Sequence, residues 1–235
     1  MKDSLLKILS WFYEPDANSS DAAIKAICGG ILIVGLVFAA GKAIALENIP
    51  PEVVSYYEDS VWSVSSPIGG GSAFHISPTF LITNKHVADI LPKGKGTMWK
   101  TTTLRNYEVE VVGVSRIYDL AVLYCAQCLH MTPQILTIQD RYFGVGTATY
   151  GGGYGFGLFA IHAGYIQAFN FWTYSITTDT IAQPGDSGSP QIVVNEDGSM
   201  SLVGVRKARK DHTVLLEPAG AVAGFMRRIG LGFLL

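Results

Sequence analysis

Residues 183–190 read Gln-Pro-Gly-Asp-Ser-Gly-Ser-Pro, and this stretch decides which fold we expect the chain to adopt. A serine hydroxyl is a weak nucleophile until a neighbouring base removes its proton. Gly185 and Gly188 permit a tight turn that presents the Ser187 Oγ atom. Backbone N–H groups in such a turn converge on one point, where they stabilise a developing oxyanion. The stretch therefore predicts a nucleophilic Ser187, against the alternative of a Gly/Ser/Pro loop without chemistry.

His86 is the candidate general base. Residues 70–75 read Gly-Gly-Ser-Ala-Phe-His, and residues 80–88 read Phe-Leu-Ile-Thr-Asn-Lys-His-Val-Ala. A Gly-rich strand thus leads through a turn at Pro78 to a second strand, which ends at Thr83 and opens into a short turn. An unperturbed histidine titrates near neutrality, so His86 in that turn can accept and return a proton. Taken alone, a histidine is more often structural or at the surface than catalytic.

Asp119 is the candidate acid. It stands at the start of the apolar run Leu-Ala-Val-Leu of residues 120–123. Because burying an unpaired carboxylate is costly, we expect Asp119 to have a partner. It would accept the proton of His86 Nδ1 and hold the ring in the useful tautomer. The alternative is an ordinary turn aspartate before a strand.

Taken together, the three motifs resemble the trypsin/chymotrypsin-like serine peptidase family, in which His, Asp and Ser follow in this order. The resemblance covers roughly residues 58–230. It implies that His86 is the base, Asp119 its orienter and Ser187 the nucleophile, with the N–H groups of Gly185 and Ser187 as the oxyanion hole. The implied activity is hydrolysis of polypeptide substrates through an acyl-enzyme, without a metal or other cofactor.

The sequence lacks features of the secreted members of the family, so the resemblance is to other branches of it. The chain has no Ile-Val-Gly-Gly stretch and lacks the family's disulfides, so Asp186 need not pair with a freed terminus, and we expect activity without zymogen cleavage. The motifs Gly-Ser-Ala-Phe at residues 71–74 and Thr-Asn-Lys-His-Val at residues 83–87 resemble those of compact HtrA-type peptidases and of the small proteases of RNA viruses. We expect no PDZ domain. Protein quality control and viral polyprotein processing both stay open as roles.

Short apolar runs broken by Gly, Pro, Asn and Asp predict an all-β fold from about residue 58 onward. We expect two packed antiparallel six-stranded β-barrels of the chymotrypsin type, at about 58–126 and 142–218, and a C-terminal helix at 219–229. Together they make a protease domain at 58–235. The predicted strands are 61–65, 71–75, 80–83, 97–104, 107–114, 120–124, 147–150, 158–165, 171–177, 191–194, 201–205 and 213–216.

An apolar stretch precedes that domain. Residues 26–41 carry no charge, and Lys25 and Lys42 flank them. With the extension to Leu46, the stretch reaches the ~20 residues that span a bilayer. We expect a single-pass transmembrane helix at 22–46, after a tail or amphipathic helix at 1–21 and before a linker at 47–57, with the side of the protease domain open. A cleaved signal peptide and a buried helix are the alternatives.

Composition and cysteines exclude other classes of protein. Net charge is -2 and no long basic run appears, so nucleic-acid binding is not expected. Three cysteines make no disulfide scaffold. Cys125 and Cys128, followed by His130, leave open a zinc site, a disulfide or reduced thiols. Reduced thiols are favoured, because no second Cys/His pair follows to complete four zinc ligands.

By the resemblance, the pocket for the residue before the scissile bond, P1, is lined by residues 202–209 and 178–182, with Ile181 near its floor. No acid stands at that floor position, so a preference for Lys or Arg is not expected. An acidic or amide P1 side chain would be recognised by charge-assisted hydrogen bonds. The candidates are Arg206, Lys207 and His212, with His162 on a neighbouring strand. Alternatively, the basic side chains point outward and leave an apolar pocket.

Two rival functions stand beside the peptidase. One is a catalytically silent protease-fold binding module at a membrane, and the other is a structural membrane protein whose motifs are coincidental. The completeness of the His-Asp-Ser constellation favours the enzyme.

Overall fold

A computed structural model describes residues 49–101, 103, 105–139, 141–155, 157–210 and 213–235 of the chain. The predicted tail at 1–21 and transmembrane helix at 22–46 lie outside these residues. Of the helices that the structure does describe, none has both the length and the apolar character needed to cross a membrane.

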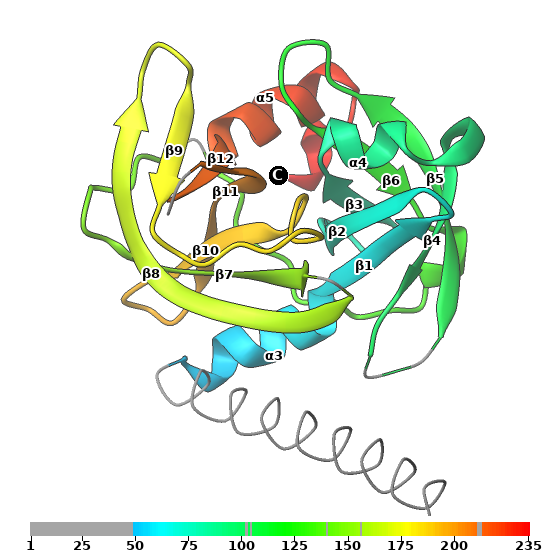
Figure 1. Cartoon of the computed structure of the whole chain (residues 1–235), viewed down its shortest axis with the longest axis horizontal. Coiled ribbons are helices and arrows are strands. Elements are labelled where there is room, and N and C mark those ends of the chain that lie inside the picture. The colour runs from blue at the N-terminus through cyan, green and yellow to red at the C-terminus, as the bar shows by residue number, and fades with distance from the viewer. Residues whose placement is uncertain (1–48, 102, 104, 140, 156, 211–212) are drawn as a thin grey trace, which may run out of the picture. The chain divides into compact units, whose positions relative to one another are not determined.

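Six antiparallel strands close into the first barrel, in the order β1-β2-β3-β6-β5-β4 (Figure 1). Its centre is apolar and includes Trp62, Leu81, Met98 and Leu123, all at most 3% exposed. A five-residue helix, α4 (Lys85–Asp89), follows β3 where the sequence predicted a turn. The strands are β1 (Val61–Ser66), β2 (Gly69–His75), β3 (Phe80–Thr83), β4 (Lys95–Trp99), β5 (Asn106–Val114) and β6 (Ala121–Tyr124).

The second barrel closes in the order β10-β11-β12-β9-β8-β7 and lies beside the first. Its strands are β7 (Ala148–Gly155), β8 (Leu158–Asn170), β9 (Ser175–Thr178), β10 (Pro190–Val194), β11 (Met200–Lys210) and β12 (Thr213–Pro218). The prediction of two closed six-stranded antiparallel barrels is confirmed. The predicted strand at 171–177 is shorter than expected, because residues 171–174 form the turn between β8 and β9.

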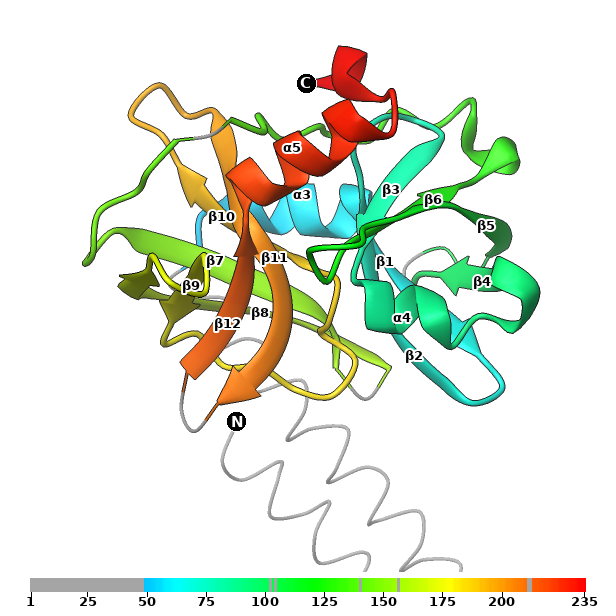
Figure 2. The same cartoon turned by 90° about the horizontal axis from the view of Figure 1, so that it is seen from above.

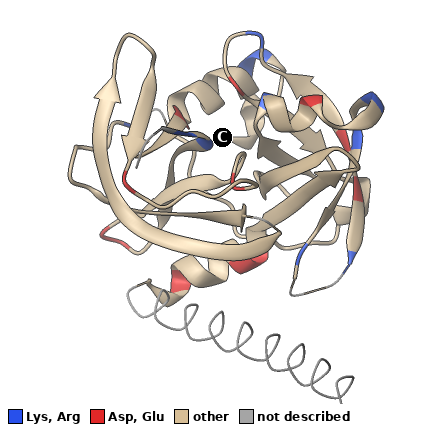
Figure 3. Cartoon of the chain, in the orientation of Figure 1, with Lys and Arg blue, Asp and Glu red and all other residues tan. Residues whose placement is uncertain are grey.

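A helix occupies most of the segment that was predicted as a linker. Helix α3 (Pro51–Ser60) begins at a proline, which tolerates the first helical position because it needs no N–H partner there. Its buried residues, Val53, Tyr56, Tyr57 and Ser60, follow the spacing of one helix face. The Tyr57 hydroxyl donates to Pro190 O at 2.7 Å, which fixes α3 to the second barrel. Figure 3 shows the acids of α3 as red bands. The linker prediction was therefore wrong for these residues.

The predicted C-terminal helix is present as α5 (Ala219–Arg228), which lies against the strands of both barrels (Figure 2). It follows β12 directly, and its Phe225 side chain approaches Gly113 of β5 in the first barrel. The short 3-10 turns are η1 (Pro92–Gly94), η2 (Ala126–Cys128) and η3 (Gly232–Leu234).

Cys125 and Cys128 form a disulfide across η2, with their Cα atoms 5.4 Å apart. The expectation of reduced thiols was therefore wrong. Both residues are fully buried in the core of the first barrel. Four residues of chain at η2 bring the two Cα atoms within the range that a disulfide bridges, a turn geometry that spacing alone does not reveal.

Candidate active site

His86 and Asp119 come together at the mouth of the first barrel. The Nδ1 atom of His86 lies 2.7 Å from Asp119 Oδ2, and the backbone N–H of His86 donates to Asp119 Oδ1 at 3.0 Å. The Asn84 side chain donates to the Asp119 carbonyl at 2.8 Å. Because a carboxylate only accepts, Nδ1 carries the proton, and the unprotonated Nε2 of the neutral ring is left to act as a base.

The environment keeps the Asp119 carboxylate ionised. Burial by itself would raise the pKa of this carboxyl, but the hydrogen bonds from the side chain and backbone of His86 outweigh burial and lower the pKa below its usual value. The His86 side chain is 49% exposed, so its outer edge is accessible to a substrate.

Two charged residues of the second barrel, Glu217 and Lys207, lie next to Asp119. The backbone N–H of Asp119 donates to Glu217 Oε1 of β12 at 3.3 Å. The Glu217 carboxylate is nearly buried, and Lys207 of β11 donates to the same oxygen at 2.8 Å. Lys207 thus neutralises Glu217, which would otherwise place an uncompensated negative charge beside Asp119.

The turn that carries Ser187 is enclosed by backbone on two sides. Gly185 and Gly188 have φ values of +103° and +89°, which side chains rarely permit. A Cβ atom on Gly185 would lie 2.4 Å from Tyr154 O in the second barrel, and one on Gly188 would lie 2.1 Å from Ser72 O in the first. Glycine is required at both positions, as the sequence predicted for a tight turn around Ser187.

Ser72 of β2 holds this turn from the first barrel. Its backbone N–H donates to Ser187 O at 2.7 Å, and its hydroxyl donates to Gly185 O at 2.8 Å. The same hydroxyl accepts the N–H of Tyr154 at 3.0 Å. Ser72 therefore ties the turn that carries Ser187, together with β7, to the barrel that carries His86.

The Ser187 hydroxyl donates to the carbonyl of Lys207 at 3.4 Å. No hydrogen bond joins Ser187 to His86 among the described residues. Ser187 nevertheless lies close to α4, because a Cβ atom on Gly188 would be only 3.2 Å from Asn84 N at the start of that helix. Within the described part of the chain, no hydrogen bond is formed by the backbone N–H groups of Gly185 and Ser187.

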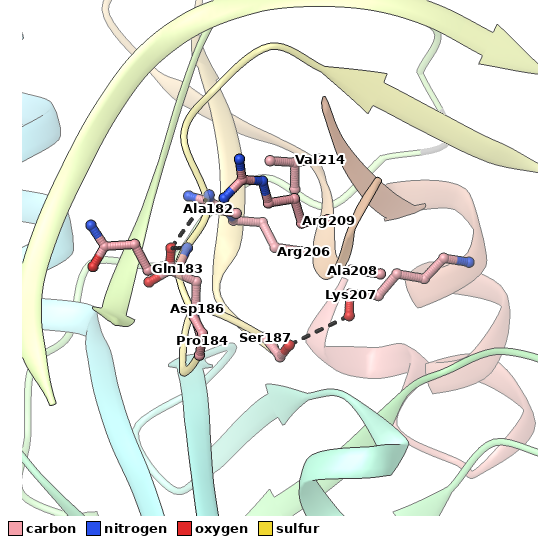
Figure 4. Close-up of a pocket in the computed structure, with 10 residues that line it drawn as sticks. All are labelled: Ala182, Gln183, Pro184, Asp186, Ser187, Arg206, Lys207, Ala208, Arg209 and Val214. Atoms are coloured by element: carbon pink, nitrogen blue, oxygen red, sulfur yellow. Dashed lines mark hydrogen bonds and ion pairs between the residues drawn. The ribbon is translucent and has the colours of Figure 1, made fainter. Parts of the chain in front are cut away.

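A pocket of about 300 Å³ adjoins Ser187 (Figure 4). The strand β11 forms one wall and the segment before Ser187 forms the other. Among the described residues that line it, Asp186 is the only one with a carboxylate, and it pairs with Arg206. The lining residues are Ala182, Gln183, Pro184, Asp186, Ser187, Arg206, Lys207, Ala208, Arg209 and Val214.

Of the residues predicted to recognise the substrate, some line this pocket and others do not. Arg206 lines the pocket but is 1% exposed, and the Lys207 ammonium is paired with Glu217. Ile181 is 58% exposed and, among the described residues, lines a neighbouring pocket and not this one. His162 is absent from the described lining, and burial lowers its pKa, with a smaller contribution from Arg206. His212 lies outside the described residues.

Sequence reasoning missed Ser72, Glu217 and the pairing of Asp186 with Arg206. The only available signal for Ser72 was its place in the Gly-Gly-Ser motif at residues 70–72. No signal in the sequence indicated Glu217, because its contact with Lys207 depends on β12 lying next to β11.

Comparison with known proteins agrees with this geometry. The pattern of the trypsin-like peptidase domain matches residues 71–205. The chain is similar to an inactive form of the protease Rv3671c, at 25% identity over 79% of this chain and 95% of that chain, with a TM-score of 0.63. The active form of Rv3671c protease from M. tuberculosis is 24% identical over 79% of this chain and 86% of that chain, with the same TM-score of 0.63. A serine endoprotease from Yersinia pestis is 22% identical over 77% of this chain and 68% of that chain, with a TM-score of 0.63. No curated protein matches the chain by sequence.

Proposed function

This chain belongs to the trypsin-like peptidase family, and we propose that Ser187, His86 and Asp119 carry out its reaction as nucleophile, general base and orienting acid. The enzyme is a serine endopeptidase, and its substrates are polypeptides. The observation that carries the proposal is the 2.7 Å contact between His86 Nδ1 and Asp119 Oδ2, because it leaves His86 Nε2 for the serine proton.

The reaction begins when the Ser187 hydroxyl turns from the Lys207 carbonyl toward His86. The 3.4 Å hydrogen bond that this change breaks is long and weak. His86 Nε2 then takes the hydroxyl proton while Oγ bonds to the scissile carbonyl carbon. The carbonyl oxygen becomes an anion, and the N–H groups of Gly185 and Ser187 stabilise it.

Collapse of this tetrahedral intermediate releases the first product. The C–N bond breaks, the departing amine takes the proton from His86, and an acyl group remains on Ser187 Oγ. Water then gives a proton to His86 while its oxygen bonds to the acyl carbon. Collapse of this second tetrahedral intermediate breaks the bond from the carbonyl carbon to Oγ, His86 returns the proton to Ser187 Oγ, and the second product leaves as an acid. The Asp119 carboxylate stabilises the imidazolium in both halves without taking its proton.

A fluorophosphonate probe tests this assignment, because it bonds covalently to activated serines. We expect the folded chain to be labelled, Ser187→Ala to abolish labelling, and His86→Ala to reduce it strongly. Ser199→Ala and His130→Ala, at exposed positions, are the matched controls and should label normally. Absence of labelling in folded wild-type protein would instead favour the catalytically silent binding module.

We further propose that the apolar residues 26–46 anchor the enzyme in a membrane as a single span. The support is their length and lack of acidic residues. Alkaline extraction should leave the full chain with the membranes, and the double substitution Ile33→Arg/Leu36→Arg should release it, because charge at the centre of a span is costly. Lys42→Arg is the control. A mature chain that begins after Ala45 would contradict the anchor and support a cleaved signal.

A further inference from the structure

A buried ion pair lies directly behind the nucleophile turn. The Arg206 Nη2 atom of β11 is 3.5 Å from Asp186 Oδ2, and the two side chains are 1% and 5% exposed. Asp186 is the residue immediately before Ser187. The pair therefore connects the reacting residue's own turn to the wall of the second barrel.

Arg206 makes this inward position of Asp186 possible. A carboxylate removed from water is strongly disfavoured unless opposite charge and hydrogen bonds replace the lost hydration. Arg206 supplies the charge, and the N–H of Gln183 donates to Asp186 Oδ2 at 2.9 Å. Without the guanidinium, the Asp186 side chain would be driven toward solvent, and the peptide groups beside it would have to rotate.

The remaining contacts of Arg206 are to backbone groups on both sides of Ser187 in the sequence. The guanidinium Nη2 also donates to the carbonyl of Ile181, ahead of the turn. The Arg206 backbone N–H donates to Ser189 O at 2.9 Å, and its carbonyl accepts the N–H of Gly188 at 2.8 Å. Nε and Nη1 of the guanidinium have no acceptor among the described residues, so Asp186 and Ile181 set its orientation.

We propose that Arg206 is a positioning residue for catalysis: it neutralises Asp186 inside the protein and so keeps the N–H groups of Gly185 and Ser187 aimed at one point. This inference rests on Ser187 being the nucleophile. Since the counter-charge is a residue of strand β11, the turn needs no terminal amine. The pairing also argues against the role expected from sequence, because a guanidinium that is buried and matched to Asp186 is not free to bind an acidic P1 side chain.

Four variants of the full chain separate positioning from simple support of the fold. Arg206→Met and Asp186→Asn each remove one charge, and the double variant removes both. Replacing a buried ion pair by neutral groups of similar size is often tolerated by the fold, so the double variant is expected to stay folded. Arg206→Lys restores the charge but not the planar contact to Ile181. Arg227→Met, at an exposed position on α5, is the matched control.

The measurements are kcat, KM and the concentration of active sites from burst titration. We expect each variant to lower kcat per titrated site by ~10²-fold, as when one oxyanion donor is lost, with KM changing by less than ~3-fold. The double variant should be no slower than the single variants, because all three break the same contact. Arg206→Lys should recover part of kcat, and the control should match wild type.

Two results would overturn the proposal. One is a folded Arg206→Met variant that turns over at the wild-type rate per site, because the turn would then keep its geometry without the counter-charge. The other is a loss confined to the number of titrated sites, which would mean that Arg206 supports folding alone. Failure of wild-type protein to give any burst would instead count against the proposed function, so the two hypotheses fail in different measurements.

Discussion

His86 Nδ1 and Asp119 Oδ2 lie 2.7 Å apart, although 33 positions separate the two residues in the sequence. The strand pairing of β3 with β6 produces this contact, since Thr83 at the end of β3 is opposite Ala121 at the start of β6. His86 follows the first of these residues and Asp119 precedes the second. The register of the barrel thus brings the Asp119 carboxylate to the His86 imidazole at one end of the sheet.

The first prediction concerns that contact. Asp119→Asn should lower kcat by about 10⁴-fold, because an amide can present a donor to Nδ1 and stabilise the wrong tautomer of His86. Steady-state kinetics on folded protein measures the effect. Asp89→Asn, exposed on the same helix as His86, should leave kcat unchanged. A loss of less than tenfold in Asp119→Asn would show that Asp119 does not orient the base.

The second prediction concerns Glu217 behind Asp119. Glu217→Gln keeps an oxygen that can accept the Asp119 N–H but breaks the charged contact with Lys207. We expect kcat to fall by about tenfold and the free energy of unfolding to fall by about 1–3 kcal/mol. Urea denaturation and steady-state kinetics measure these changes, with Glu196→Gln at an exposed position as the control. Unchanged kinetics would remove Glu217 from the support of the triad.

The third prediction concerns pH and the buried His75. Burial lowers the pKa of its imidazole to about 4, while its Nδ1 remains hydrogen-bonded to the carbonyl of Ser77 at 2.9 Å. An unfolded histidine titrates near 6.5, so the unfolded state binds more protons between the two values. Stability is therefore fully present above about pH 6.5 and is lost as pH falls toward 4, by about 3 kcal/mol.

His75→Gln tests that sign, because glutamine keeps a polar side chain that does not titrate. Urea denaturation at pH 7 and pH 4 should show a smaller loss of stability in this variant than in wild type. His130→Gln, at an exposed position, should behave like wild type. Equal losses in wild type and His75→Gln would refute the assignment of this pH dependence to His75.

The fourth prediction concerns specificity. The described residues that line the pocket beside Ser187 include three basic ones, Arg206, Lys207 and Arg209, and the one carboxylate among them, Asp186, is already paired. A basic P1 side chain would find no unpaired acid among these residues, so a peptide library should yield almost no cleavage after Lys or Arg. A profile dominated by Lys or Arg would contradict the position of this pocket.

Features encoded in contiguous residues could be predicted from the sequence. The turn at Gly185–Gly188 needs only its own glycines, and His86 and Asp119 stand beside apolar runs that mark strand ends. The two barrels followed from the same alternation of apolar runs and turn residues. The order of the three motifs then supplied the family.

Features created by pairing between strands could not be predicted. Arg206 reaches Asp186, and Lys207 reaches Glu217, only once β11 is placed beside both the nucleophile turn and β12. From sequence, adjacent basic residues on a strand look like solvent-facing or substrate-facing charges. Helix α3 was missed for a different reason, since Pro50 and Pro51 read as a linker although a proline also begins helices well.

The position of the covalent adduct tests the central claim most directly. Full-length protein is treated with a fluorophosphonate, digested and analysed by mass spectrometry. We predict one modified residue, Ser187, with no adduct in Ser187→Ala and normal modification in Ser199→Ala. An adduct at another serine, or none in protein shown to be folded, would contradict the assignment of Ser187 as the nucleophile.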